Sequence, residues 1–399
     1  MVTRKVYLDY SATTPTRSEV VEAMKPYFAE IFGNASSLHA FGQEARKALA
    51  DARESIAAII GAKPDEIIFT GCGTEADNMA LKGAVWANSG NGNHIITTKI
   101  EHHAILQTCE YLETQGFKVT YLDVDSNGRL DPQTVRKAFL PQTILVSVMH
   151  ANNEVGAIQP IADIGQIIAA ENANRANPGA SQIYFHTDAV QSAGKMKINV
   201  NELKVDLLSI SAHKFYGPKG VGMLYVRRGT CMTPLFHGGH HERNRRAGTE
   251  NISGIVGMAK ALEMCATDMD AEQARQRALR ERLEKGILAT IPDAVINGSG
   301  GPRVANVLNC SFRAIEGEGL LLSLDLEGIA VSTGSACASG SSEPSHVLKA
   351  MCIDTALAQG TIRFSLGRLT TDDDISYVLE VLPRVVSRLR SMSPLWKGK

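Results

Sequence analysis

Lys214 lies where an apolar run, residues 207–211, meets a turn that contains Gly217 and Pro218. A lysine at the mouth of a strand can form a Schiff base in a semi-enclosed site, although a solvated strand-end lysine is the ordinary alternative. Asp188 ends an earlier apolar run and supplies a carboxylate. Pyridoxal phosphate needs both groups, because a lysine binds its aldehyde and a carboxylate keeps its pyridine nitrogen protonated. The two residues together predict a site for this cofactor.

Further polar residues follow apolar runs of the same kind. A glycine-rich turn at 71–74 opens a helical pattern, and its backbone N–H groups suit a phosphate, although many such turns only join two elements. His102 begins another helical pattern, where an imidazole can stack on a ring, move a proton or simply lie in solvent. Asn152 and Asn153 follow a third run, and their amides can bond a ring oxygen or a carboxylate. Because open α/β sheets bind ligands at the carboxyl ends of their strands, we expect these residues to meet.

Cys337 is set in a run of small residues, 331–342, that cannot build a packed core. We therefore expect a mobile loop with an exposed thiol, whose exposure is either catalytic or accidental. The seven cysteines are widely spaced and form no C-x-x-C pair, so the sequence indicates neither a disulfide framework nor a zinc knuckle. A reducing, cytoplasmic setting fits this pattern.

Composition argues against several classes of protein. The net charge of -1 gives no general attraction to nucleic acid or to an anionic membrane. The sequence starts without an apolar signal region and no window approaches a membrane-spanning length, so we expect neither export nor an anchor. Two clusters, 237–241 and 243–246, could suggest a metal or nucleic acid. We interpret the first cluster as a glycine-rich loop at a subunit interface. We interpret the second cluster as a part of the cofactor pocket or of the subunit contact.

Seven apolar runs alternate with helical patterns from residue 67 onward. The runs begin near residues 67, 94, 119, 144, 183, 207 and 222, and most are separated by helical patterns near 75–87, 102–115, 132–139 and 161–171. This alternation predicts an α/β fold with a mostly parallel seven-stranded sheet and helices on both faces. Only about ten residues separate the last two runs, too few for a helical crossover, so one edge strand should be antiparallel.

The character of the sequence changes after Gly254. A charged helix near 270–289, strands near 304–312 and 361–366, and a closing helix at 372–389 indicate a second, smaller α+β domain. Within the first part, the polar segment at 172–180 predicts an exposed surface loop.

Ordered motifs over nearly the whole chain resemble the cysteine desulfurases of the NifS/IscS family, which are fold-type I pyridoxal-phosphate enzymes of the class V aminotransferase group. The matching stretches are residues 7–15, 33–39, 73–78, 101–102, 152–154, 186–191, 211–214, 238–243, 246–251, 334–337, 343–345, 363–368 and 393–396. The resemblance implies pyridoxal 5'-phosphate as cofactor and a homodimer. It also implies a large cofactor domain at 16–260 and a small domain, made of 1–15 with 261–399, that carries the cysteine loop.

Carried over position by position, the resemblance implies a role for each residue near the cofactor. Lys214 would hold the cofactor, Asp188 would pair with the pyridine nitrogen, and Gln191 would bond the ring hydroxyl. His102 would stack on the ring and act with Lys214 and Cys337 as a catalytic residue. The phosphate-binding set would be Gly73, Thr74, Ser211 and His213, with Thr249 from the other subunit.

Asn153 and Arg363 would hold the substrate carboxylate, and Asn153 also lies among the cofactor-binding positions. The implied activity converts L-cysteine to L-alanine and leaves the sulfur on Cys337 as a persulfide for an iron-sulfur scaffold protein or another acceptor. No intrinsic metal site is implied, apart from a transient role for Cys337 as an iron-sulfur ligand. Two alternatives stay open: a selenocysteine lyase or small aminotransferase on the same fold, and a sulfur carrier or scaffold without catalysis.

Four features bear on the subtype within the family. Cys72 and the run at 242–251 are similar to the nitrogen-fixation branch. The sequence stops three residues after Trp396, whereas housekeeping members carry a longer tail that helps to reach the scaffold. The polar insert at 172–180 is longer than is usual in the family.

Overall fold

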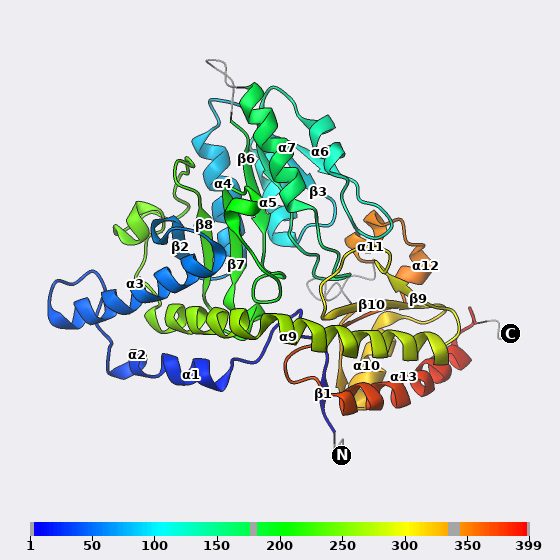
Figure 1. Cartoon of the computed structure of the whole chain (residues 1–399). Coiled ribbons are helices and arrows are strands. Elements are labelled where there is room, and N and C mark those ends of the chain that lie inside the picture. Colours follow the sequence, from blue (N-terminus) through cyan, green and yellow to red (C-terminus); the bar gives the residue numbers. More distant parts are fainter. Residues whose placement is uncertain (1–3, 176–181, 334–343, 397–399) are drawn as a thin grey trace.

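A central sheet organises the computed structural model, which describes residues 4–175, 182–333 and 344–396. Within these residues the sheet has seven strands in the order β2-β8-β7-β6-β5-β3-β4 (Figure 1). The strands are β2 (Ile67–Thr70), β3 (His94–Thr98), β4 (Lys118–Leu122), β5 (Thr143–Ser147), β6 (Tyr184–Asp188), β7 (Leu207–Ser211) and β8 (Gly222–Val226). Each corresponds to one predicted apolar run, so the predicted mostly parallel sheet is confirmed.

The antiparallel strand is β8, and its predicted position at the edge of the sheet is wrong. β8 pairs antiparallel with β7 on one side and with β2 on the other, so it lies inside the sheet. The short connection does force β8 to reverse beside β7, as expected. The length of this connection does not determine whether another strand pairs with the second edge of β8. All five residues of β8 are buried, which fits an internal strand.

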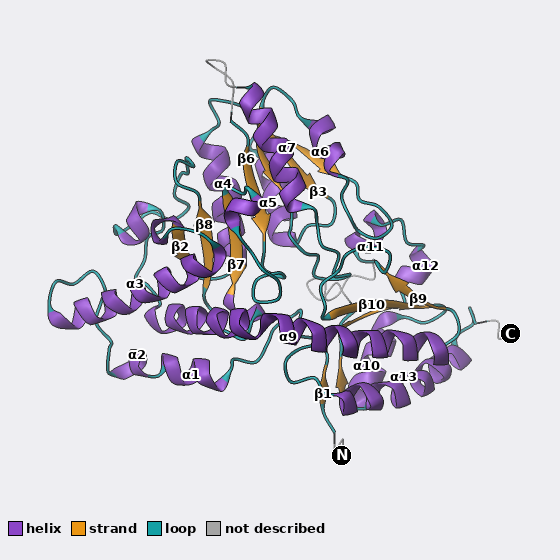
Figure 2. Cartoon of the chain, in the orientation of Figure 1, coloured by secondary structure: helices purple, strands orange, loops and turns teal. Residues whose placement is uncertain are grey.

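Helices cover both faces of the sheet (Figure 2). On one face α4 (Gly73–Ala87) and α5 (His103–Thr114) pack on one set of strand side chains. On the other face lie α3 (Ala40–Ile60), α6 (Pro132–Ala138), α7 (Ile161–Asn174), the short α8 (Val200–Leu203) and the first part of α9 (Ile252–Thr290). Successive strand residues point to opposite faces, which explains why the runs are apolar throughout.

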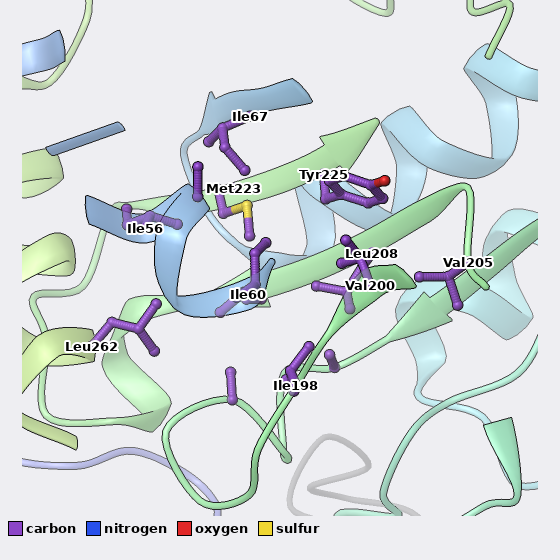
Figure 3. Packing of buried hydrophobic residues seen from close by; sticks show 14 of the residues in the cluster. Ile56, Ile60, Ile67, Ile198, Val200, Val205, Leu208, Met223, Tyr225 and Leu262 are labelled. Carbon is purple, nitrogen blue, oxygen red and sulfur yellow. The ribbon is translucent and has the colours of Figure 1, made fainter. Parts of the chain in front are cut away.

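Helix α3 packs on the sheet through apolar residues that are spaced one helical turn apart. Ile56 and Ile60 lie one turn apart on α3 and are buried against strand residues such as Ile67 and Met223 (Figure 3). Gly61 ends α3 in the left-handed conformation, with a φ of 72°.

A second hydrophobic core holds the C-terminal part of the chain and the N-terminal strand. Its antiparallel sheet has the order β12-β10-β9, and β1 pairs in parallel with β11 nearby. Residues Val6 and Leu8 belong to the same cluster as Leu283 and Phe364, although the chain ends are far apart in sequence. The elements are β1 (Val6–Tyr7), β9 (Ala294–Asn297), β10 (Val307–Phe312), α10 (Gly317–Leu326), β11 (Ile329–Ala330), α11 (His346–Ala350), α12 (Thr355–Ala358), β12 (Thr361–Ser365) and α13 (Asp372–Met392).

Helix α9 connects the two cores. It begins at Ile252 rather than near Asp270, because the residues in its first turns are small and fit closely against neighbouring helices. A Cβ on Gly257, for example, would lie 2.6 Å from Met24 Sδ. The early part of α9 packs in the first core and residues from Leu279 onward pack in the second. The division of the chain into domains at 260/261 remains a prediction, and that boundary falls inside a continuous helix.

The remaining elements are short. They are α1 (Ser18–Met24), α2 (Pro26–Ala29) and the 3-10 turns η1 (Pro64–Glu66), η2 (Ala212–Lys214) and η3 (His241–Asn244). No helix among the described residues has the length and apolar character needed to cross a membrane. Of the predicted surface loop at 172–180, residues up to Asn174 belong to α7, and 176–181 lie outside the described residues.

Candidate active site

A cavity of about 300 Å³ lies at the carboxyl ends of the central strands. It brings together most of the predicted site residues: Gly73, Thr74, His102, Asn153, Asp188, Gln191, Ser211, His213, Lys214 and Arg363 all line it. Thr249 is exposed and does not line the cavity of this single chain. Cys337 lies outside the described residues. The expectation that polar residues after successive strands would meet is therefore confirmed.

The start of α4 forms one wall and can receive a phosphate. Cys72 is the N-cap, and the helix begins at Gly73, so backbone N–H groups and the positive end of the helix dipole face this wall. A Cβ on Gly73 would lie 2.9 Å from Val190 Cγ2 and 3.2 Å from Ser211 Cβ, so only glycine fits. The Ser211 hydroxyl is buried and has no hydrogen-bond partner among the residues that the structure describes. An anionic ligand here would supply the missing acceptor.

Lys214 is held in the cavity by the N-terminal segment. Its Nζ donates to the carbonyl oxygens of Ser11 at 2.7 Å and Ala12 at 2.8 Å. Lys214 lies at the end of η2, directly after β7, and His213 beside it contacts Thr13 Oγ1 through Nδ1 at 3.2 Å. Burial, followed by the nearby Lys214 charge, lowers the pKa of His213 to about 4. The imidazole of His213 is therefore neutral at physiological pH.

Asp188 ends β6 at the floor of the cavity. Burial raises the pKa of its carboxyl to about 6, while the Val190 N–H at 2.8 Å and the Lys214 charge oppose that rise. Asp77, from α4, also lines the cavity, and burial together with the charge of Asp188 raises its pKa well above the ordinary value. Two buried carboxyls near one cation favour one proton between them at neutral pH.

His102 is the N-cap of α5 and presents a neutral ring to the cavity. Its Nδ1 accepts from the Ala104 N–H at 3.2 Å, which places the ring proton on Nε2. Burial, then the charges of Lys214 and the neighbouring histidines, lower the pKa of His102 to about 4. A neutral ring in this position can stack on a flat heteroaromatic ligand without bringing a charge.

Arg363 projects from β12 in the second core and is almost completely buried. It pairs with Asp9 at 2.7 Å and donates to the Asn153 carbonyl at 2.9 Å. Its Nε has no acceptor within the described part of the chain. A substrate carboxylate could use this donor, since a buried guanidinium N–H should be paired.

Several polar lining residues were not assigned a role from the sequence: Ser11, Asp77, His103, Glu154 and His346. The rings of His103 and His346 lie 4.9 Å apart, and His346 Nε2 donates to the Glu101 carbonyl at 2.9 Å. Ser345 donates to Glu154 at 2.5 Å and so ties α11 to the site. Ser11, Asp77 and Glu154 lie within stretches that matched the family, and His103 and His346 directly follow such stretches. Only tertiary contacts single out the individual side chains.

The two clusters that could suggest a metal or nucleic acid have other contacts. Among the described residues there is no group of histidines, cysteines and carboxylates that could hold a metal ion. In the first cluster, His241 Nδ1 lies 3.1 Å from Glu250 Oε1. Glu242, between the two clusters, forms a buried ion pair with Arg53 and accepts from the Phe69 N–H at 2.9 Å. Arg246 pairs with Glu75 at 2.8 Å, and Glu75 accepts from the Gly71 N–H. Arg246 therefore supports the turn that precedes α4.

The residues of the cavity fit pyridoxal phosphate. They supply a lysine, a buried carboxylate, a flat neutral imidazole and an anion site built from a helix N-terminus and an unpaired hydroxyl. These are the groups needed to bind the aldehyde, the pyridine nitrogen, the ring and the phosphate of this cofactor. The carboxyl edge of a mostly parallel sheet is also the expected position for such a ligand.

Comparison with known proteins gives the same result. The aminotransferase class-V family matches residues 6–378. The cysteine desulfurase IscS of Dictyoglomus turgidum is 54% identical over 397 residues, which cover 99% of this chain and 98% of that protein. A solved NifS-like protein has a TM-score of 0.89 and 39% identity, covering 97% of this chain and 100% of that one. The structure of SspA in complex with cysteine has a TM-score of 0.80 and 37% identity, covering 91% and 99%.

Fold and site together define a fold-type I pyridoxal-phosphate enzyme. The chain belongs to the class V aminotransferases and, within them, to the cysteine desulfurases of the NifS/IscS family.

Proposed function

We propose that this protein converts L-cysteine to L-alanine and leaves the sulfur on Cys337 as a persulfide. The observation that carries the proposal is that one cavity holds Lys214 and Asp188 together with the buried Arg363. The family relationship supplies the reaction class, and a solved relative was obtained in complex with cysteine. Bound pyridoxal phosphate serves as an electron sink for the bonds at the substrate α-carbon.

The residues of the chain divide the work in this proposal. Lys214 would anchor the cofactor and move a proton at the substrate α-carbon, while Asp188 would supply the anion that pairs with the pyridine nitrogen. Arg363, with Asn153 beside it, binds and orients the substrate carboxylate. His102 covers the ring and can donate a proton through Nε2. Gly73, Thr74, Ser211 and His213 hold the phosphate, Gln191 the ring hydroxyl, and Thr249 of a second copy completes the site.

Cys337 carries the sulfur step. Its thiolate forms a bond to the substrate sulfur, the carbon-sulfur bond breaks, and its electron pair passes to the alanine-forming fragment. The persulfide sulfur then passes to an acceptor, for which we propose an iron-sulfur scaffold protein. A cytoplasmic homodimer is part of the same proposal.

Replacing Cys337 by serine tests this function. We expect Cys337→Ser to bind pyridoxal phosphate with an unchanged visible spectrum and to respond spectrally to L-cysteine. Because the nucleophile is lost, its rate of alanine formation should fall at least about 100-fold below that of the wild type. Alanine would be measured by chromatography. Cys231→Ser is the control, since Cys231 is an exposed free thiol that does not line the cavity.

Mass spectrometry of the wild type after brief exposure to L-cysteine gives a second, independent result. One added sulfur should appear on the peptide that contains Cys337. Alanine formation at the wild-type rate by Cys337→Ser, or a persulfide confined to another cysteine, would contradict the proposal.

A further inference from the structure

Lys195 is a half-buried cation that lies next to the cofactor cavity, beside its lining residue Gln191. It follows β6 in a helical turn, in which the N–H groups of Lys195 and Met196 donate to the Ser192 carbonyl. Gly194 has a φ of 70°, and a Cβ there would lie 2.5 Å from Phe215 Cβ, so the turn is fixed against the start of the Lys214 loop. This geometry brings the Lys195 side chain alongside Gln191.

A chain of hydrogen bonds joins Lys195 to the cofactor lysine. Lys195 Nζ donates to Gln191 Oε1 at 2.8 Å, and Gln191 Nε2 donates to the Ser11 carbonyl at 3.0 Å. The same carbonyl accepts from Lys214 Nζ at 2.7 Å. A protonated lysine can only donate and a carbonyl can only accept, so the two contacts fix which end of the Gln191 amide is oxygen and which is nitrogen.

The fixed orientation has a consequence for ligand binding. Gln191 lines the cofactor cavity, and Nε2 has a second N–H beyond the one that Ser11 receives. With Oε1 occupied by Lys195, the group that Gln191 offers to a ligand is a donor. A cation bonded to the amide oxygen also polarises the amide and strengthens its N–H as a donor.

We propose that Lys195 is a positioning residue for the cofactor: its ammonium orients and polarises the Gln191 carboxamide, which then donates to the ring oxygen of pyridoxal phosphate. This inference rests on the proposed function, because it needs the cofactor in the cavity and Gln191 at its ring oxygen. It assigns a function to a lysine that is not among the residues lining the cofactor cavity in the described part of the chain.

The charge of Lys195 is sensitive to its surroundings. Burial lowers its pKa to about 7, and the cations Lys214 and Arg363 act in the same direction. The phosphate and ring oxygen of the bound cofactor are anionic and favour the protonated form. The Cys265 thiol lies on the other side, where Lys195 lines a second cavity of about 260 Å³. That cavity leaves room for a larger cation.

The test uses the visible absorbance of the holoenzyme as a function of pH. A positive charge and a strong donor at the ring oxygen stabilise its negative charge and so disfavour a proton on the nitrogen that joins Lys214 to the cofactor. In Lys195→Met this proton should persist to higher pH, so the midpoint of the absorbance change should rise by about one pH unit. Lys195→Arg should return the midpoint close to that of the wild type.

Two controls separate positioning from folding. Lys197→Met removes a charge of the same kind two positions further along the chain. The Lys197 side chain is exposed, so this variant should leave the midpoint unchanged. In a Gln191→Leu background, Lys195→Met should cause no further shift, because the effect passes through Gln191. Thermal denaturation of the cofactor-free variants measures any purely structural contribution.

The outcomes are distinct. A midpoint in Lys195→Met equal to that in Lys197→Met, with only a lower denaturation temperature, would overturn the inference and leave the proposed function intact. A full additional shift in the Gln191→Leu background would also overturn it. If the wild type binds no pyridoxal phosphate and makes no alanine, the proposed function itself fails.

Discussion

At the scale of single residues, burial gives two neighbouring carboxyl groups different roles. Asp77 has the more strongly raised pKa, because it is completely buried and feels the charge of Asp188. Asp188 is closer to its ordinary range, because the Val190 N–H and Lys214 stabilise its anion. Asp77 is therefore the protonated partner at neutral pH, and Asp188 is the anion that a protonated pyridine ring needs.

Asp188→Asn should separate cofactor binding from catalysis. The amide fills the same space but cannot balance a positive pyridine nitrogen, so we expect near-normal cofactor occupancy with kcat lower by about 100-fold or more. Occupancy would be read from the visible spectrum and kcat from alanine release. Asp268→Asn, at a partly exposed carboxylate paired with Arg17, serves as the matched control. Wild-type turnover in Asp188→Asn would rule out this role.

At the scale of elements, the ends of β3 and β5 are joined by one buried carboxyl. Glu101 follows β3, and its Oε1 accepts from Thr98 Oγ1 at 2.6 Å and from the Met149 N–H at 3.0 Å. Its Oε2 has no partner within the described ranges. Burial raises the pKa of Glu101 from 4.5 to about 8. The ends of β3 and β5 are therefore joined by a carboxyl group that is protonated in the native state at neutral pH.

This contact makes stability depend on pH in a definite direction. Between pH 4.5 and about 8 the native state holds a proton on Glu101 that the unfolded chain has released, so stability falls as pH rises through that window. The Glu101→Gln side chain cannot ionise, so this variant should not lose stability through this window. Relative to wild type, it should gain about 2 to 3 kcal/mol of unfolding free energy between pH 5 and pH 8.

Urea denaturation of the cofactor-free protein at the two pH values measures this gain. Glu110→Gln, at an exposed position on α5, should behave like the wild type at both. A Glu101→Gln variant whose stability follows the pH dependence of the wild type would show that Glu101 does not hold the proton.

At the scale of the whole molecule, the site draws on both hydrophobic cores. β1 pairs with β11 and so carries Asp9, Ser11 and Ala12 from the second core to Lys214 and Arg363. Thr249, which the family places in the site, is exposed in the single chain. A second copy is therefore expected to complete the cofactor pocket.

Hybrid dimers test this expectation. We predict that Lys214→Ala and Thr249→Asp are each nearly inactive, because one lacks the anchor and the other repels the phosphate. A dimer with one copy of each, isolated through two different affinity tags, contains one wholly wild-type site and should recover about half of the wild-type activity. Hybrids no more active than their parents, or a fully active monomer in sedimentation, would exclude a shared site.

The sequence by itself determined the seven strands, most of the helices that cover them and many of the polar residues that line the cavity. Apolar runs of strand length, bounded by turn residues, depend on local spacing, and polar residues after such runs must meet at one edge of a parallel sheet. For this reason Lys214, Asp188 and His102 could be brought together before any coordinate was known. The family motifs added their chemical roles.

Only the tertiary structure decided the contacts between segments far apart in the chain. Pairing on the second edge of β8, the long course of α9 across both cores, and the Ser11 and Asp9 contacts all depend on long-range packing that no local pattern encodes. The same holds for protonation. The high pKa of Glu101 and the fixed amide of Gln191 follow from burial and from particular neighbours, and both exist only once the chain has folded.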